Sequence, residues 1–243
     1  MPERRARGRL PKIDPLPPDI ARAIYEFGIP VHVPTGGALY HQGEAAEHVY
    51  VVSAGYVKMT STSATGHQVV VAFLGPLYTL GLAALAIPPV YIFNALAATP
   101  VTAYRRTRAQ AERMRLHPSF RHYLDQLAYH YTEILATRLH SLSEGPLAER
   151  VAASLLELAV MHGTPADHGG MVDIEPPVTF EDLGGLAGTT VEAISRYITQ
   201  WREAGAVLPR IGKRRISLYP ERLRDVVWRS GPLLSDNGRG DRT

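Results

Sequence analysis

Two short helical patterns on either side of Gly188 constrain the fold more than any other feature of this sequence. Thr179, with Asp182 three residues further on, forms a variant of the capping box that begins a helix. Thr190 can cap a second helix, and Gly205 can end it in a left-handed conformation. A helix, a tight turn containing glycine and a second helix together predict a helix-turn-helix.

The second of these helices is expected to have two different sides. Ile194, Ile198 and Trp201 recur at helical spacing and should face the core. The outward side carries Thr190, Val191, Glu192, Ser195, Arg196 and Thr199. Residues 206–208 and 216–219 then predict two strands joined by a basic turn, so the whole segment predicts a winged helix-turn-helix.

Residues 31–106 show another pattern, in which apolar runs of strand length alternate with glycines and polar turns. Short strands at near-regular spacing predict a small β-barrel or β-roll. Strands are expected over residues 49–52, 56–59, 68–74 and 101–104, after a short helix over 19–27.

A long helical pattern covers residues 119–142, after a shorter one over 108–116. Its apolar residues recur at alternating steps of four and three, at Phe120, Leu124, Leu127, Tyr131, Leu135, Leu139 and Leu142. About 24 helical residues span roughly 36 Å, which is more than a small barrel needs. We therefore predict a helix that pairs with a second copy of the chain, and a helix packed on its own barrel is the alternative.

These patterns predict an α+β fold with an N-terminal β-roll, a long dimerisation helix and a C-terminal winged helix-turn-helix. A break at Gly145-Pro146 is expected to act as a hinge. The expected parts are a mobile basic, proline-rich arm (1–18), a β-roll sensor domain (19–116), a dimerisation helix (117–144), the winged domain (145–229) and a flexible tail (230–243).

The composition excludes several kinds of site. Without cysteine, the chain cannot form disulfides, thiol redox switches, or cysteine-ligated zinc or iron–sulfur centres. No apolar stretch approaches the roughly 20 residues of a membrane helix, and the basic N-terminus is not followed by a signal peptide, so we expect a cytoplasmic protein with no membrane partner. The net charge is only +3, but basic residues gather from Arg196 onward, which favours a polyanionic partner.

In two separate places the sequence resembles the CRP/FNR family of bacterial transcription regulators. Residues 179–196 are similar to the family's helix-turn-helix, and residues 37–44 together with 49–57 are similar to its glycine-marked, cyclic-nucleotide-binding-like β-roll. The resemblance covers most of the chain. It implies a homodimer whose recognition helices enter successive major grooves, about 34 Å apart, on a near-palindromic double-stranded DNA operator. RNA polymerase is a further expected partner.

Within this resemblance, Glu192 can accept a hydrogen bond from a cytosine amine and Arg196 can make a bidentate contact with guanine. For Glu192 the alternative is a carboxylate that the helix dipole favours near the N-terminus of the helix. For Arg196 the alternative is a surface ion pair. Val191 resembles the fumarate and nitrate branch of the family, where the cyclic-AMP receptor branch has arginine, and this predicts a TTGA-type half-site. We expect bases to be read by Val191, Glu192, Ser195 and Arg196, and phosphates to be bound by Thr189, Thr190, Thr199, Lys213, Arg214 and Arg215.

The sensor region departs from the family's nucleotide-binding pattern. Gly81 is kept, but Leu82 stands where the family has glutamate, and residues 89–90 are Pro-Val where it has arginine beside serine or threonine. No basic residue lies between Lys58 and Arg105, so a buried cyclic phosphate would be an uncompensated charge. A cyclic nucleotide is therefore not expected.

Three interpretations of the sensor remain open. It can be a barrel core without a ligand, which would make DNA binding constitutive. It can hold a small apolar or aromatic effector among Leu80, Leu82, Leu85, Tyr91, Phe93, Tyr123, Leu127, His130 and Tyr131. It can hold haem, since the family includes haem sensors, although no ligand-spaced pair is formed by His41, His48, His67, His122 and His130. No other metal is expected.

Other classes of function have less support. The chain contains no phosphate loop of P-loop type, no His-Glu-x-x-His and no Gly-x-Ser-x-Gly, so we expect no enzyme. The alternatives to a DNA-binding regulator are a regulatory module of an enzyme and a dimeric scaffold whose winged module binds protein. Whether target genes are activated or repressed is left open by the sequence.

Overall fold

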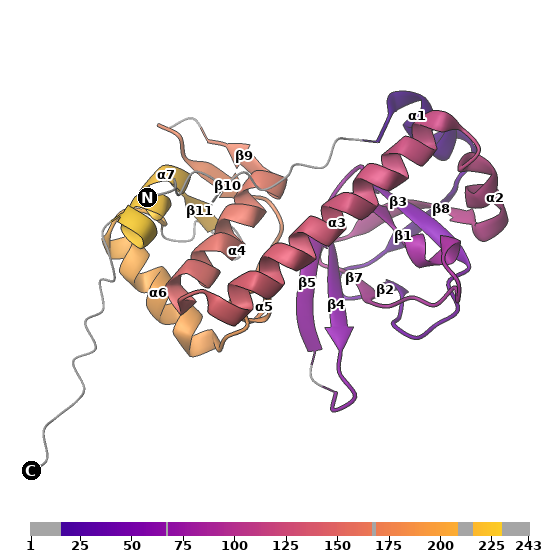
Figure 1. Cartoon of the computed structure of the whole chain (residues 1–243). Helices are drawn as coiled ribbons and strands as arrows, with labels where there is room; N and C mark the ends of the chain where they lie inside the picture. The colour runs from indigo at the N-terminus through magenta and orange to yellow at the C-terminus, as the bar shows by residue number, and fades with distance from the viewer. Residues whose placement is uncertain (1–15, 67, 167–168, 209–215, 230–243) are drawn as a thin grey trace, which may run out of the picture.

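A computed structural model describes residues 16–66, 68–166, 169–208 and 216–229 (Figure 1). A β-roll forms one lobe and a mostly helical bundle forms the other, and one long helix runs from the first lobe toward the second. The arm and tail expected at 1–18 and 230–243 lie wholly or almost wholly outside the described residues. No helix within the described ranges is long and apolar enough to cross a membrane.

The first lobe confirms the predicted β-roll. Two four-stranded antiparallel sheets face each other, with strand orders β1-β8-β3-β6 and β2-β7-β4-β5. After helix α1 (Pro18–Phe27), the strands are β1 (Ile29–Val33), β2 (Ala38–Tyr40), β3 (His48–Ala54), β4 (Val57–Thr62), β5 (Gln68–Leu74), β6 (Thr79–Leu80), β7 (Asn94–Ala97) and β8 (Val101–Thr107). A short 3₁₀ helix, η1 (Leu82–Leu85), follows β6.

The glycine between β3 and β4 shows why the roll needs this residue at its turns. Gly55 has φ +82°, a left-handed conformation that glycine adopts without strain. A Cβ atom there would lie 2.1 Å from the carbonyl oxygen of Pro100. The turn therefore combines an unusual backbone angle with a close approach of two chain segments.

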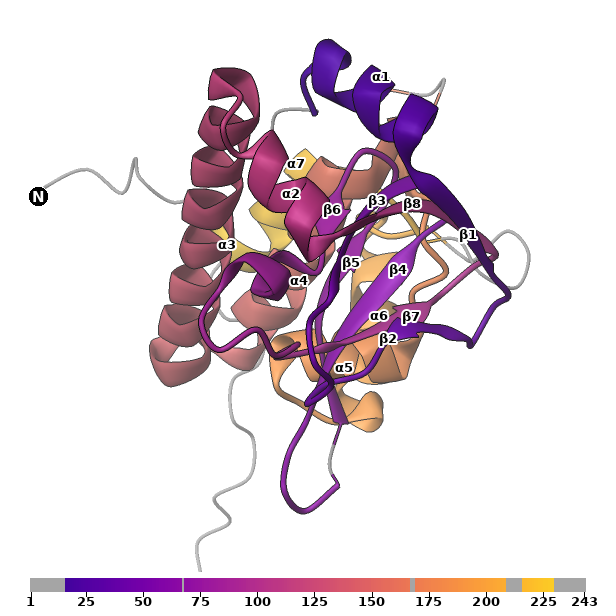
Figure 2. The same cartoon turned by 90° about the vertical axis from the view of Figure 1, so that its right-hand side faces the viewer.

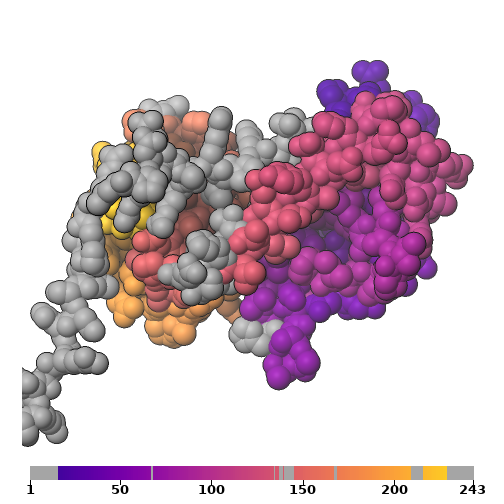
Figure 3. Space-filling view, viewed as in Figure 1, coloured from indigo at the N-terminus to yellow at the C-terminus, as the bar shows by residue number. Residues whose placement is uncertain are grey.

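Helix α3 (Pro118–Glu144) follows α2 (Arg108–Met114) and lies along the roll, where it is visible across the front of the molecule (Figure 3). Phe120 is 1% exposed and Leu127 is fully buried. Together with Tyr123 they pack with Leu16, Ile20, Ile24 and Val51 in a cluster that we call the α1/α3 cluster. The first half of α3 is thus part of the core of its own chain.

This burial corrects the prediction of one continuous dimer seam. Phe120 and Leu127 are filled positions in the core of their own chain, whereas Leu124 and Tyr131 are half-buried and only partly covered by residues of the same chain. Leu135 is 48% exposed and Leu139 is 70% exposed, and they remain candidates for contact with a second copy. In a straight helix of 3.6 residues per turn, a stripe that repeats every 3.5 residues rotates around the helix axis by about 20° per heptad. The stripe therefore begins on one face of α3 and ends on another. The side chain of Leu142 lies outside the described residues.

The second lobe has a helical core with a small sheet at its edge. Its elements are α4 (Leu147–His162), β9 (Gly163–Pro165), β10 (Val172–Ile174), α5 (Phe180–Ala187), α6 (Val191–Glu203), β11 (Ile216–Leu218), α7 (Pro220–Arg224) and a single π-helical turn, η2 (Asp225–Arg229). The sheet has the order β11-β10-β9. Val207 bridges Leu218, so the stem of the predicted wing forms, while its turn, 209–215, lies outside the described residues. The sequence did not predict β9 and β10, which are three-residue strands in a loop rich in glycine and proline.

The burial of α3 can be tested with two phenylalanines. We expect Phe120→Ala to lower the free energy of unfolding by about 3–5 kcal/mol, because it leaves a cavity in the α1/α3 cluster. Phe27→Ala is the matched control, since Phe27 is 65% exposed, and it should change stability by no more than about 0.5 kcal/mol. Urea denaturation at one protein concentration measures both. Equal effects of the two substitutions would contradict the described packing of α3.

Candidate nucleic-acid interface

The helix-turn-helix begins with the predicted capping box. The Thr179 hydroxyl accepts the backbone N–H of Asp182 at 3.0 Å, and Asp182 Oδ2 accepts the N–H of Thr179 at 2.9 Å. Helix α5 ends at Gly188, which has φ +61°. A Cβ atom at Gly184 would lie 2.8 Å from the carbonyl oxygen of Thr189, so the turn folds tightly against α5. These contacts confirm the predicted start and end of the helix.

Helix α6 has the predicted buried and exposed sides. The Thr190 hydroxyl accepts the N–H of Ala193 at 3.4 Å and caps its first turn. Ile194, Ile198 and Trp201 are at most 2% exposed and belong to the core of the lobe. The side away from this core exposes Thr190, Val191, Glu192, Ser195, Arg196 and Thr199. The four predicted base-reading residues therefore share one accessible surface.

A groove of about 760 Å³ follows this exposed side. Its lining residues are Phe180, Val191, Glu192, Ser195, Arg196, Thr199, Gln200 and Glu203. Sequence reasoning missed three of them. Gln200 and Glu203 stand four residues after Arg196 and Thr199, so helical spacing could have found them, whereas Phe180 comes from α5 and enters only through the tertiary structure.

The charged groups of the groove suit hydrogen bonding to base edges. The pKa of the Glu192 carboxyl is lowered because its own backbone N–H and the Thr190 hydroxyl donate hydrogen bonds to the charged form. Glu192 therefore stays an acceptor over a wider pH range than an ordinary glutamate. The Arg196 guanidinium carbon lies 5.4 Å from the centre of the Tyr197 ring, an arrangement that suits a cation–π contact. Both charged ends stay accessible to a ligand because both residues are exposed.

The predicted phosphate-binding residues are only partly described. Thr190 and Thr199 are exposed at the two ends of the reading surface, and Thr189 is half-buried in the turn. Arg150, on α4, donates to the carbonyl oxygen of Gly188 at 3.4 Å and adds a basic side chain beside this turn that the sequence did not suggest. Lys213, Arg214 and Arg215 lie outside the described residues.

Helix α5 is fixed to the roll as well as to its own lobe. Lys58 Nζ, on β4, lies 2.9 Å from Asp182 Oδ1, and the Asp182 side chain is only 5% exposed. A Cβ atom at Gly185 would lie 2.9 Å from the backbone nitrogen of Val70, on β5. Figures 1 and 2 show α5 next to the β4 and β5 strands. The orientation of the reading surface is thus tied to the roll.

A second contact between the lobes involves His162 at the end of α4. Its Nε2 lies 2.6 Å from the carbonyl oxygen of Phe73, so this nitrogen carries a proton and donates. The Tyr56 ring meets the imidazole edge-on at a centroid distance of 5.5 Å. Burial lowers the pKa of His162 from 6.5 to about 4, and the hydrogen bond to Phe73 only partly opposes this effect. His162 therefore makes this contact between the lobes as a neutral imidazole.

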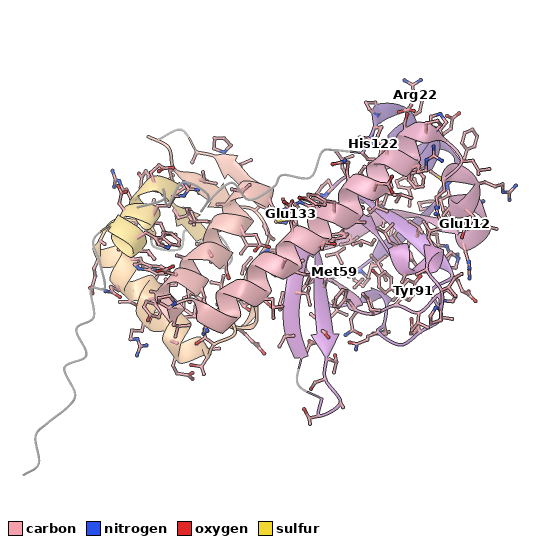
Figure 4. The ribbon with its side chains drawn as sticks, in the orientation of Figure 1. Arg22, Met59, Tyr91, Glu112, His122 and Glu133 are labelled. Carbon is pink, nitrogen blue, oxygen red and sulfur yellow. The ribbon has the colours of Figure 1, made fainter. Side chains whose placement is uncertain are left out.

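The predicted effector residues lie within packed clusters. Tyr91, labelled in Figure 4, stacks on Tyr40 at a centroid distance of 3.8 Å, and its hydroxyl donates to the carbonyl oxygen of His48 at 2.8 Å. Tyr123 and Tyr131 bond the side chain and the backbone of Thr79 at 2.9 and 3.3 Å. Leu80, Leu82, Leu85 and Phe93 pack in the apolar core between the strands of the roll, which also contains Val52, Val57 and Ala103 and which we call the roll cluster. Leu127 belongs to the α1/α3 cluster.

The histidines considered as haem ligands lie at different depths in the described part of the chain. His41 and His122 are exposed, His48 is half-buried, and His130 is 4% exposed on α3. His122 stands near the roll end of α3 in Figure 4. Among the described residues there is no cluster of three or more histidine or acidic side chains that could hold a metal ion. His67 lies outside the described residues.

Two family models match this chain in the order of its two lobes. The cyclic nucleotide-binding domain matches residues 30–116, and the Crp-like helix-turn-helix domain matches residues 149–226. The chain belongs to the CRP/FNR family. It is a transcription regulator with a DNA-binding helix-turn-helix.

Relatives and solved structures of this family cover most of the regulator. It is 27% identical over 193 residues to the nitrogen fixation regulation protein FixK of Rhizobium meliloti, covering 79% of this chain and 83% of that protein. It is 24% identical over 184 residues to a CRP-like cAMP-activated global transcriptional regulator of Mycobacterium tuberculosis, covering 72% and 78%. The structure of FixK2 from Bradyrhizobium japonicum has the same fold, with a TM-score of 0.69, 24% identity and coverage of 82% and 96%.

The interface histidine gives a prediction for pH dependence. The unfolded chain binds a proton at His162 near pH 6.5, whereas the folded chain does so only near pH 4. The contribution of His162 to stability is thus complete above about pH 6.5 and is lost as the pH falls to about 4, by at most roughly 3 kcal/mol. His162→Gln keeps a donor for Phe73 but does not titrate, so its stability should fall less steeply over this range. Urea denaturation at a series of pH values measures both proteins, and identical slopes would contradict this assignment.

Proposed function

We propose that this regulator binds DNA as a homodimer, and that α6 of each copy reads a TTGA-type half-site of a near-palindromic operator without the help of a cyclic nucleotide. The observation that carries the proposal is the groove along α6, where Val191, Glu192 and Arg196 are all exposed on one surface. The major groove of DNA is wide enough for an α-helix, and each base pair presents a different pattern of donors and acceptors there.

The residue types in the groove favour particular bases. Arg196 can donate two hydrogen bonds to guanine O6 and N7, and the carboxylate of Glu192 can accept from the N4 amine of cytosine. Val191 is 42% exposed and has no donor, so it favours a thymine methyl group over a further guanine. These three preferences together support a half-site of the TTGA type.

A second copy of the chain fits the exposed part of α3. Leu135 and Leu139 are large apolar side chains that lie one helical turn apart on an accessible face. Burying them against the same residues of another copy would remove this apolar surface from water. Two copies related by a twofold axis would present two copies of α6, which matches an inverted repeat. RNA polymerase is the further partner that we propose, because the chain is a transcription regulator.

The roll supports DNA binding that does not depend on a cyclic nucleotide. One relative is described as cAMP-activated, but here Leu82 is a half-buried part of the apolar roll cluster, and the Tyr40 ring is stacked on Tyr91. The described part of the roll between Lys58 and Arg105 carries no cation for a phosphate. An anion placed there would lose its hydration without gaining a lysine or arginine partner from this stretch.

The operator prediction can be tested by selection from randomised DNA duplexes. We expect inverted TTGA-type half-sites, and we expect Arg196→Ala to weaken binding to the selected operator by roughly 5- to 150-fold, through loss of the guanine contact. Arg22→Ala is the matched control, because it removes an equal charge from the exposed face of α1 in the other lobe. Selection of TGTGA-type half-sites, or unchanged affinity after Arg196→Ala, would refute the proposed mode of reading.

The proposed independence of cyclic nucleotides can be tested on the same operator. We expect the ligand-free protein to bind specifically, and millimolar cyclic AMP to change its dissociation constant by less than about twofold, since a ligand without differential affinity shifts no equilibrium. Fluorescence anisotropy measures the affinity, and the cAMP-activated mycobacterial relative serves as the positive control. A tenfold gain in affinity with cyclic AMP would show that the roll accepts the nucleotide.

A further inference from the structure

The groove along α6 has one wall that α6 does not supply. Among its described lining residues, Phe180 belongs to α5, and all the others belong to α6. Phe180 is half-buried, and part of its side chain packs on the core of the C-terminal lobe. Its remaining surface adds an aromatic side to the region that the proposed function places against DNA.

The backbone around Phe180 is held firmly. Thr179, just before it, and Asp182, two residues after it, exchange the two hydrogen bonds of the capping box at 2.9 and 3.0 Å. The same Asp182 is bound to Lys58 of the roll at 2.9 Å. A phenylalanine side chain has only two torsions, so Phe180 loses little conformational entropy when a ligand covers it.

The charges in the groove favour base edges over phosphates. Among the described lining residues, Glu192 and Glu203 each place a carboxylate in the groove, against one guanidinium, that of Arg196. A phosphate that entered the groove would meet more negative than positive charge. Base edges carry no net charge, so they are the part of DNA that this surface suits.

The apolar feature that a base presents in the major groove is the 5-methyl group of thymine. Val191 is one apolar side chain exposed in the groove, and Phe180 is a second one that comes from another helix. We propose that Phe180 is a further specificity-determining residue, which contacts the methyl group of an operator thymine different from the one that Val191 contacts. The inference rests on the proposed function, because it requires α6 to lie in the major groove.

The test removes single methyl groups from the DNA. Each thymine of the selected operator is replaced in turn by deoxyuridine, and the affinities of the wild-type protein, Phe180→Ala and Val191→Ala are measured by fluorescence anisotropy at one salt concentration. The wild-type protein should bind about fourfold more weakly when a contacted methyl group is missing. Phe180→Ala should lose this sensitivity at one thymine and keep it at another, and Val191→Ala should show the reverse pattern.

Three further variants separate base contact from a purely structural role. Phe180→Gln keeps much of the side-chain volume and should lose the same methyl sensitivity, so the comparison stands even if the alanine variant does not fold. Phe180→Leu should keep part of the sensitivity, since it remains apolar. Phe27→Ala, a change at a 65% exposed phenylalanine of α1, should leave all affinities unchanged.

Two results would overturn the inference and leave the proposed function intact. One is that Phe180→Ala and Phe180→Gln weaken binding equally to the thymine and deoxyuridine operators, which would show a structural role. The other is that folded Phe180 variants keep the full sensitivity of the wild-type protein at every thymine. A wild-type protein that prefers no sequence at all would instead overturn the proposed function, and this inference with it.

Discussion

Asp182 is almost completely buried, and its two carboxylate oxygens bind two different parts of the chain. One accepts the backbone N–H of Thr179 and fixes the first turn of α5, and the other meets Lys58 on the roll. A buried carboxylate without these partners would be costly, because water no longer solvates it. The start of the helix-turn-helix and one of its contacts with the roll therefore share a single side chain.

The neighbouring contacts make this attachment specific. Gly185 brings α5 so close to Val70 that no larger residue fits without movement, and His162 reaches across from α4 to the backbone of β5. Val70 and Phe73 are strand residues of the roll, yet they belong to the core of the C-terminal lobe. The described contacts between the two lobes include shared apolar burial, the Lys58–Asp182 ion pair and the hydrogen bond from His162 to the carbonyl oxygen of Phe73, in addition to the connecting chain.

The parts of the structure that the sequence predicted are those determined by local rules. Thr179 and Asp182 lie three residues apart, and Ile194, Ile198 and Trp201 follow the helical period, so both patterns are visible without any tertiary information. The Lys58–Asp182 pair joins residues 124 positions apart, and no local pattern indicates it. The same reason explains why Phe180 was missed as part of the groove.

The error along α3 has a related cause. Phe120 and Leu127 continue the same apolar stripe as Leu135 and Leu139, and a periodicity cannot say which partner covers each turn. The roll is shorter than the helix, so the first turns pack on the roll and α1, while the later turns extend beyond them (Figure 1). The first part of the apolar stripe thus packs in the core of its own chain, and the later part lies on an accessible face of the helix.

The two lobes differ in where their neutral and their ionised polar side chains lie. Inside the roll the hydroxyls of Tyr40 and Tyr91 form hydrogen bonds, and burial raises the pKa of both, so these side chains stay neutral. The groove along α6 instead presents ionised side chains at its surface. The described residues between Lys58 and Arg105 offer no lysine or arginine to an anionic effector, whereas accessible charges lie on the helix that α5 orients. Because α5 rests on β4 and β5, a signal that shifts this contact would reorient the helix-turn-helix even if it never enters the roll.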